Sequence, residues 1–183
     1  MSHVTFKGAA VPLTGTFPQA GEKSPSFALT AGDLSELTLA SLEGKKVVLN
    51  IFPSIDTATC ATSVRTFNAK AAELENTVVV CISADLPFAA GRFCELEGIE
   101  GVQHASTFRS PAFASDYGVA IAEGPLSGLT TRAVVVVDEK GVVTHTASWL
   151  QRLLKSQTTK RRLQHCKSHF MQKCLKLDSA DSA

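Results

Sequence analysis

One short segment, residues 53–60, holds the side chains best suited to nucleophilic chemistry, and it ends on a cysteine. Pro53 follows the apolar run 47–52 and ends it, because proline has no backbone N–H for a sheet ladder. Thr57 is a good N-cap residue, and a helical pattern follows it. Cys60 is therefore expected in the first turn of a helix, where unpaired N–H groups and the helix dipole favour a thiolate.

A plainer interpretation of these residue types stays open. Free cysteines are among the most buried residues in proteins, and most of them only pack. Cys81 lies within an apolar, β-branched run and is expected to be such a packing residue. Cys94 has the position of a helix-core residue, and Arg132 that of a strand-start arginine paired at the surface. Residue types alone therefore single out only Cys60 as a candidate nucleophile.

The composition is that of a single globular domain. The chain has 183 residues, of which 44% are hydrophobic, and no apolar run is long enough to predict a membrane span. The N-terminus lacks the charged and apolar regions of a secretory signal. Five cysteines at irregular spacing do not indicate a disulfide framework. We therefore expect a cytoplasmic protein whose cysteines serve catalysis or redox chemistry.

The apolar patterning predicts an α/β protein. The order strand, helix, strand, helix, followed by an antiparallel pair, predicts a mixed central sheet flanked by helices, with a β-hairpin before it. A cysteine at the first strand-to-helix junction makes this a thioredoxin-like architecture. No C-x-x-C pair is present, which argues against a general disulfide oxidoreductase. The predicted elements are a hairpin over 4–13, strands over 26–29, 33–39, 47–52, 77–83, 102–106, 133–138 and 142–145, and helices over 57–74, 88–96 and 111–117.

The spacing Pro53-x-x-x-Thr57-x-x-Cys60 resembles the signature of peroxiredoxins. From about residue 4 to residue 145 the chain is similar to their atypical two-cysteine group, the bacterial thiol peroxidases. This resemblance is much more specific than the short signature, because it includes many longer phrases. Among them are CISADLPF at 81–88, RFC at 92–94, STFR at 106–109, YGVAIA at 117–122 and RAVVV at 132–136.

The resemblance implies a role for each of five residues. Cys60 would attack the terminal oxygen of a peroxide and become a sulfenic acid. Thr57 would hydrogen-bond the sulfur and a peroxide oxygen, and Arg132 would supply a cation that holds the substrate oxygen. Pro53 would shield the site from water. Cys94 would condense with the sulfenic acid into an intrachain disulfide, which a thioredoxin-type reductant would reopen.

The implied activity is reduction of hydrogen peroxide and alkyl hydroperoxides by a homodimer, with no cofactor, metal, nucleic acid or membrane partner. Cys60 and Cys94 lie 34 residues apart on different predicted helices. They should be beyond bonding distance in the reduced fold, so both helices would unwind locally to form the disulfide. Two alternatives stay open: a non-enzymatic redox sensor or binding protein that uses the same thiol, and a folded but inactive chain.

The end of the chain departs from this family. Residues 1–146 hold 10 Lys and Arg against 15 Asp and Glu, whereas residues 147–177 hold 8 basic residues and no acidic one. The family ends in a segment of the type QLVAEIT-EPDYEAALAAL. One permissible set of codons for residues 148–166, read one base earlier, encodes QLVAEITKEPDYEAALAAL. We interpret residues 1–146 as the domain and 147–183 as a frameshifted, poorly ordered tail, so its basic run and its His and Cys spacing predict no ligand.

Overall fold

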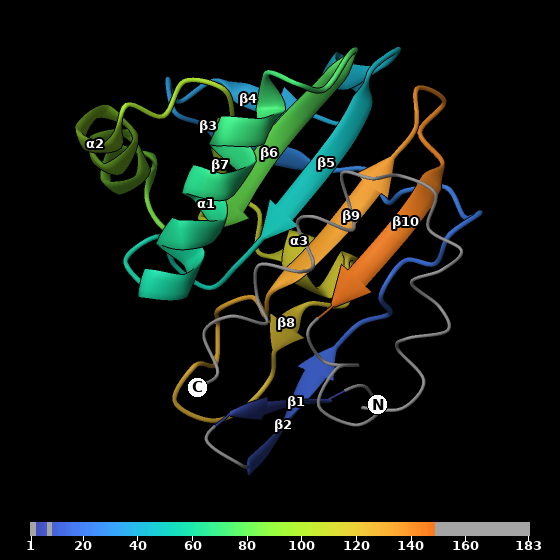
Figure 1. The fold of residues 1–183 in the computed structure, drawn as a ribbon. Helices are drawn as coiled ribbons and strands as arrows, with labels where there is room; N and C mark the ends of the chain where they lie inside the picture. The colour runs from blue at the N-terminus through green and yellow to red at the C-terminus, as the bar shows by residue number, and fades with distance from the viewer. Residues whose placement is uncertain (1–2, 7–8, 149–183) are drawn as a thin grey trace, which may run out of the picture. The chain divides into compact units, whose positions relative to one another are not determined.

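The computed structural model of the chain describes residues 3–6 and 9–148. Within them the chain forms a seven-stranded mixed sheet and a smaller three-stranded sheet (Figure 1). The predicted α/β, thioredoxin-like fold is thereby confirmed. In chain order the elements are β1 (His3–Phe6), β2 (Ala9–Thr14), β3 (Ala28–Ala31), β4 (Glu36–Thr38), η1 (Ala40–Leu42), β5 (Lys46–Ile51), α1 (Ala58–Ala71), β6 (Thr77–Ser83), α2 (Pro87–Glu97), β7 (Gln103–Ser106), α3 (Ala112–Asp116), β8 (Ala120–Ile121), β9 (Ala133–Val137) and β10 (Val143–Ser148).

The large sheet has the strand order β10-β9-β5-β6-β7-β3-β4. Its centre is parallel, because β5 pairs with β6 and β6 pairs with β7 in the same direction. The flanking strands β9 and β3 run antiparallel to β5 and β7. Strands covered on both faces need apolar residues at nearly every position, which explains the valine-rich sequences of β5, β6 and β9.

Alternation along the central strands separates two apolar clusters, one on each face of the sheet. Val47, Leu49 and Ile51 of β5 belong to the larger cluster, which also contains Phe113 of α3 and the neighbouring Tyr117. The smaller cluster lies on the face that α1 and α2 cover (Figure 1). Its buried members are Phe52, Ile55, Cys60, Val64, Cys81 and Ile99, with Phe93, Cys94 and Val102 packed against them.

The N-terminal hairpin is present as predicted. β1 pairs antiparallel with β2, and β2 continues the small sheet by pairing Leu13 with Ile121 of β8. The chain returns from this sheet very close to the end of α3. Gly118 permits this approach, because a Cβ there would lie 2.3 Å from the backbone nitrogen of Phe17, and because its φ of +60° suits glycine.

Several predicted boundaries differ from the observed ones. Residues 33–39 do not form one strand, since Asp33 accepts hydrogen bonds from the backbone N–H and the hydroxyl of Ser35 and makes a turn before β4. The helix after Cys60 ends at Ala71 rather than at residue 74. The two-residue strand β8 was not predicted, because it is too short to show alternation.

The predicted tail, apart from residues 147 and 148 at the end of β10, lies outside the described residues. In the part of the chain that is described, no helix has the length and apolar character needed to span a membrane.

Candidate active site

The segment with the candidate nucleophile begins where β5 ends. Phe52 still bonds to the sheet, because its backbone N–H donates to the Ile82 carbonyl at 3.0 Å. The half-buried Pro53 follows, and α1 begins five residues later. Cys60 is the third residue of α1, with only 2% of its surface exposed. It therefore lies in the first helical turn, as predicted, and it is a free thiol.

Thr57 occupies the N-cap position of α1 with an extended backbone (φ −91°, ψ 137°). Its hydroxyl does not cap the helix, however. It donates to the carbonyl of Ser54 at 3.1 Å and so closes the loop on itself. The backbone of Thr57 takes part in the same turn, since its N–H also donates to Ser54. The structure thus places Thr57 beside the helix start, with its hydroxyl engaged within the loop.

Arg132 comes to the same edge of the sheet through the pairing of β9 with β5. It is partly buried and directly precedes Ala133, which pairs with Ile51 at the end of β5. The adjoining Thr130 is buried, and its hydroxyl donates to the Phe52 carbonyl at 2.8 Å. The start of β9 is therefore bound to the point where the Pro53 loop leaves the sheet. The chain therefore leaves β5 at Pro53 close to the point where it enters β9 after Arg132.

Cys94 lies in the second half of α2 and packs against the small cluster that contains Cys60. Cys60 and Cys94 are both free thiols in this structure. Cys94 is half-buried, and burial raises the pKa of its thiol.

Cys81 is a packing residue, as the sequence predicts. It is buried on β6 in the same cluster, and burial raises the pKa of its thiol to about 12. Its sulfur accepts a weak hydrogen bond from the amide nitrogen of Asn50 at 3.5 Å. Asn50 also accepts from Ser63 of α1, so the amide joins β5, β6 and α1. A thiol so strongly disfavoured as a thiolate is a poor nucleophile.

The helix that carries Cys94 buries few of its side chains against the rest of the domain. Only Pro87 and Ala90 of α2 are fully buried, whereas Phe88 and Leu96 are 68% and 79% exposed. The C-terminal end of α2 is linked to α1 by a two-pronged ion pair, in which Arg65 donates to both oxygens of Glu97 at 2.8 and 2.7 Å. The Arg65 guanidinium also lies over the ring of Phe93, 5.6 Å from its centroid. These contacts are exposed and join the two cysteine-bearing helices.

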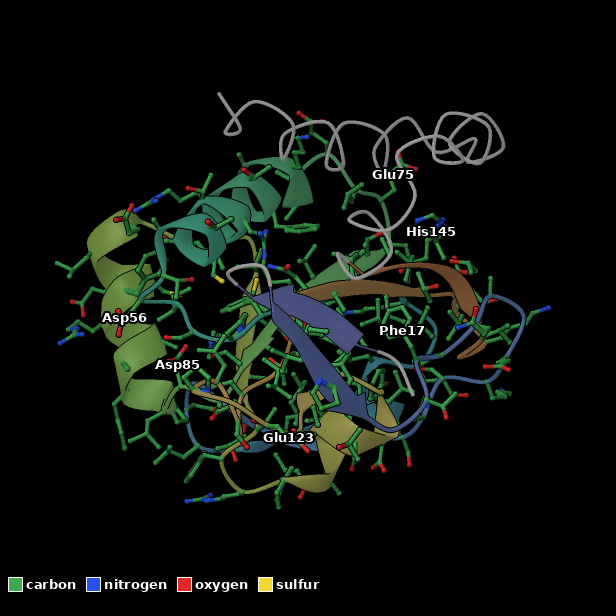
Figure 2. The ribbon with its side chains drawn as sticks, turned by 90° about the horizontal axis from the view of Figure 1, so that it is seen from below. Phe17, Asp56, Glu75, Asp85, Glu123 and His145 are labelled. Carbon is green, nitrogen blue, oxygen red and sulfur yellow. The ribbon has the colours of Figure 1, made fainter. Side chains whose placement is uncertain are left out.

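Sequence reasoning missed one group of side chains between these segments. Asp85 lies just before α2 but does not cap it, since the N-cap is Leu86 and no side chain caps the helix. The Asp85 carboxylate instead accepts hydrogen bonds from the backbone N–H of Ile55 and from the hydroxyls of Ser54 and Ser83. Figure 2 shows Asp85 and Asp56 on the same side of the molecule. No sequence spacing indicates a contact across 30 residues.

Comparison with known proteins agrees with this architecture. Residues 19–148 match the model of the redoxin family. A thiol peroxidase from Corynebacterium glutamicum is 51% identical over 146 residues, which cover 80% of this chain and 88% of that protein. The chain belongs to the thiol peroxidases, within the redoxin family. It is therefore an enzyme, a thiol peroxidase, and the family resemblance seen in its sequence is confirmed.

Solved structures related to this peroxidase have the same fold. A peroxiredoxin-like protein from Aquifex aeolicus superposes with a TM-score of 0.76 at 36% identity, over 81% of this chain and 86% of the other. A thiol peroxidase from Chromobacterium violaceum superposes with a TM-score of 0.75 over 88% of this chain and 98% of its own; at 23% identity it supports the fold alone.

Across residues 3–6 and 9–148, no three His, Cys, Asp or Glu side chains gather closely enough to hold a metal ion.

His104 of β7 adjoins the Asp85 group and makes this part of the fold sensitive to acid. Its Nε2 lies 3.3 Å from the Ser83 hydroxyl, which itself donates to Asp85. Its Nδ1 is buried, and within the described residues no hydrogen-bond partner meets it. A proton on Nδ1 would thus be buried without an acceptor. Burial lowers the pKa of His104 to about 4, although the charge of Asp85 acts in the opposite direction.

The depressed pKa predicts a loss of stability in acid. The unfolded chain takes up a proton at His104 near pH 6.5, whereas the folded chain does so only near pH 4. The free energy of unfolding should therefore fall as the pH drops from 6.5 to 4, by up to about 1.4 kcal/mol per pH unit from this group. Urea unfolding of the wild type and of His104→Gln at pH 7, 6 and 5 measures it. The variant should lose this part of the slope, and equal slopes would contradict the account.

Proposed function

We propose that this peroxidase reduces hydrogen peroxide and alkyl hydroperoxides with Cys60 as its nucleophile. The observation that carries the proposal is a free thiol, 2% exposed, in the first turn of α1 at the edge of the sheet where Arg132 also emerges. The thiolate attacks the terminal peroxide oxygen, and the O–O bond breaks. Cys60 becomes a sulfenic acid, and the other oxygen takes a proton and leaves as water or an alcohol.

The surrounding residues stabilise the charge that moves in this step. The backbone N–H groups of the first turn of α1 favour the thiolate. Arg132 supplies the cation that holds the substrate oxygen, which its place next to the end of β5 supports. Thr57 leaves the Ser54 carbonyl by rotation of its side chain and donates to the sulfur or the peroxide. Pro53 shields the site and, having no N–H, offers the sulfenate no extra backbone donor.

Cys94 completes the cycle as the resolving thiol. It attacks the sulfur of the Cys60 sulfenic acid, a disulfide forms, and water leaves. The light attachment of α2 supports this step, because few buried side chains oppose its displacement toward Cys60. A dithiol reductant of the thioredoxin type then reopens the disulfide by exchange and is itself oxidised. Three free thiols in the described residues suit a reducing compartment, and we place the enzyme in the cytoplasm.

The same region supplies a surface for a homodimer. Leu86 and Phe88 at the start of α2, and Phe108 after β7, are large apolar side chains that are 50%, 68% and 41% exposed. The two segments adjoin, because the Ser106 hydroxyl donates to the Asp85 carbonyl. Large exposed apolar side chains on adjoining segments support an interaction surface here. A second copy of the chain is the partner we propose for it.

Replacing each cysteine separates their roles. Cys60→Ser should lower peroxide consumption with a thioredoxin system by at least about a thousandfold, because the nucleophile is removed. Cys94→Ser should consume about one equivalent of peroxide and then stop, because the sulfenic acid has no partner. Cys81→Ser, the matched control in the same cluster, should turn over normally. Undiminished turnover by Cys60→Ser, or none by the intact chain, would remove the proposal.

We also propose that residues 147–183 are read out of frame. The matched family region ends at residue 148, which supports this interpretation. The gene sequence tests it directly: from about residue 147, the codons read one base earlier should encode the family ending. Codons that cannot do so would refute the frameshift. A version with the family ending should also melt at a higher temperature, because the expected strand and helix would cover apolar surface.

A further inference from the structure

We propose that Asp85 is a positioning residue for both halves of the catalytic cycle. It holds the loop before Cys60 in the form that reacts with peroxide, and release of its contacts allows Cys60 and Cys94 to meet. The inference rests on the roles proposed above for the two cysteines.

The Asp85 carboxylate accepts hydrogen bonds from two adjacent residues of the loop before Cys60. One oxygen accepts from the Ser54 hydroxyl at 2.8 Å, and the other accepts from the backbone N–H of Ile55 at 2.6 Å. Hydrogen bonds to an ionised acceptor are about twice as strong as neutral ones. Ile55 is itself buried in the cluster that contains Cys60. The carboxylate therefore fixes both the polar backbone and the apolar anchor of the loop.

Asp85 is also hydrogen-bonded to the sheet, through residues at the ends of β6 and β7. The Ser83 hydroxyl at the end of β6 donates to the carboxylate at 2.8 Å, and the Ser106 hydroxyl at the end of β7 donates to the Asp85 backbone carbonyl at 2.5 Å. These serines are fully buried. When the loop moves, the contacts to Ser54 and Ile55 are thus the ones that break, while those to Ser83 and Ser106 stay with the sheet.

The position of Asp85 in the chain links its hydrogen bonds with the loop to the helix that carries Cys94. It lies two residues after β6 ends and two residues before α2 begins at Pro87. The first turn of α2 starts from the adjoining Leu86, whose carbonyl accepts from Ala89 and Ala90. One residue therefore joins the loop that precedes Cys60 to the start of the helix that carries Cys94. The local unwinding of both segments that we expect during disulfide formation would strain or break the contacts of this residue.

The contacts predict opposite changes in two rates. While Asp85 is hydrogen-bonded to Ser54 and Ile55, the loop stays in the peroxide-reactive form. Disulfide formation requires these hydrogen bonds to break first. Loss of one contact should speed disulfide formation about tenfold or more, the usual worth of one hydrogen bond to a charged group. Oxidation of Cys60 by peroxide should become slower, because the reactive form is less populated. A residue that only stabilised the whole fold would change the amount of active protein but not the ratio of these rates.

Asp85→Ala and Ser54→Ala in the full chain test the proposal, with Asp85→Asn as the conservative variant. Asp138→Ala is the matched control, because Asp138 also accepts two backbone N–H bonds but does so in the turn before β10. Reduced protein is mixed with hydrogen peroxide, quenched with a thiol-blocking reagent at set times and analysed by mass spectrometry. This gives the rate of Cys60 oxidation, the rate of disulfide formation, and the yield of sulfinic acid at rising peroxide.

Asp85→Ala and Ser54→Ala should form the disulfide about tenfold faster or more and give less sulfinic acid. Asp85→Asn should lie between the wild type and Asp85→Ala, because its amide oxygen still accepts from Ile55 and Ser83 but carries no charge. Asp138→Ala should match the wild type. If Asp85→Ala does not fold, Ser54→Ala decides alone. A wild-type ratio of the two rates in Ser54→Ala would overturn this inference only. Absence of a Cys60–Cys94 disulfide in the wild type would overturn the proposed function and this inference with it.

Discussion

The parallel pairing of β5 with β6 is the constraint on which the site depends. Ile51 pairs with Ile82, and the next residue, Phe52, still bonds to the Ile82 carbonyl, so both strands end at the same edge. Parallel strands release their following loops at one edge, where α/β proteins gather their functional groups. The loop before Cys60 leaves from β5, and the loop with Asp85 leaves from β6. Their contact follows directly from this register.

The same strands also give the thiols different surroundings. Alternation along β6 turns Cys81 into the small apolar cluster, where the thiolate is strongly disfavoured. Cys60 shares that cluster but stands at a helix start, among N–H groups that favour negative charge. Cys60 and Cys81 are therefore buried to a similar extent, but their backbone surroundings differ: Cys60 is at the start of a helix and Cys81 is within a strand. Cys94 is held on a helix with few buried side chains, which suits the resolving role proposed for it.

The sequence predicts what local chemistry determines and misses what distant contacts determine. The place of Cys60 follows from a proline, a cap residue and a helical pattern within eight residues. β6 is a β-branched and almost wholly apolar run, so its bounds are predicted as observed. The bond from Ile55 to Asp85 spans 30 residues and depends on strand register, which no spacing encodes. Nor does the sequence reveal that the Thr57 hydroxyl turns back to Ser54 or that Phe88 lies exposed.

The central claim is that Cys60 and Cys94 form one redox pair within a single chain, although each is a free thiol in this structure. The most direct measurement treats the reduced full-length enzyme with one equivalent of hydrogen peroxide, blocks the remaining thiols, and maps the disulfides by proteolysis and mass spectrometry. The account predicts one intrachain link between Cys60 and Cys94, with Cys81 still blocked as a free thiol. A link through Cys81, or a Cys60 that remains reduced, would contradict it.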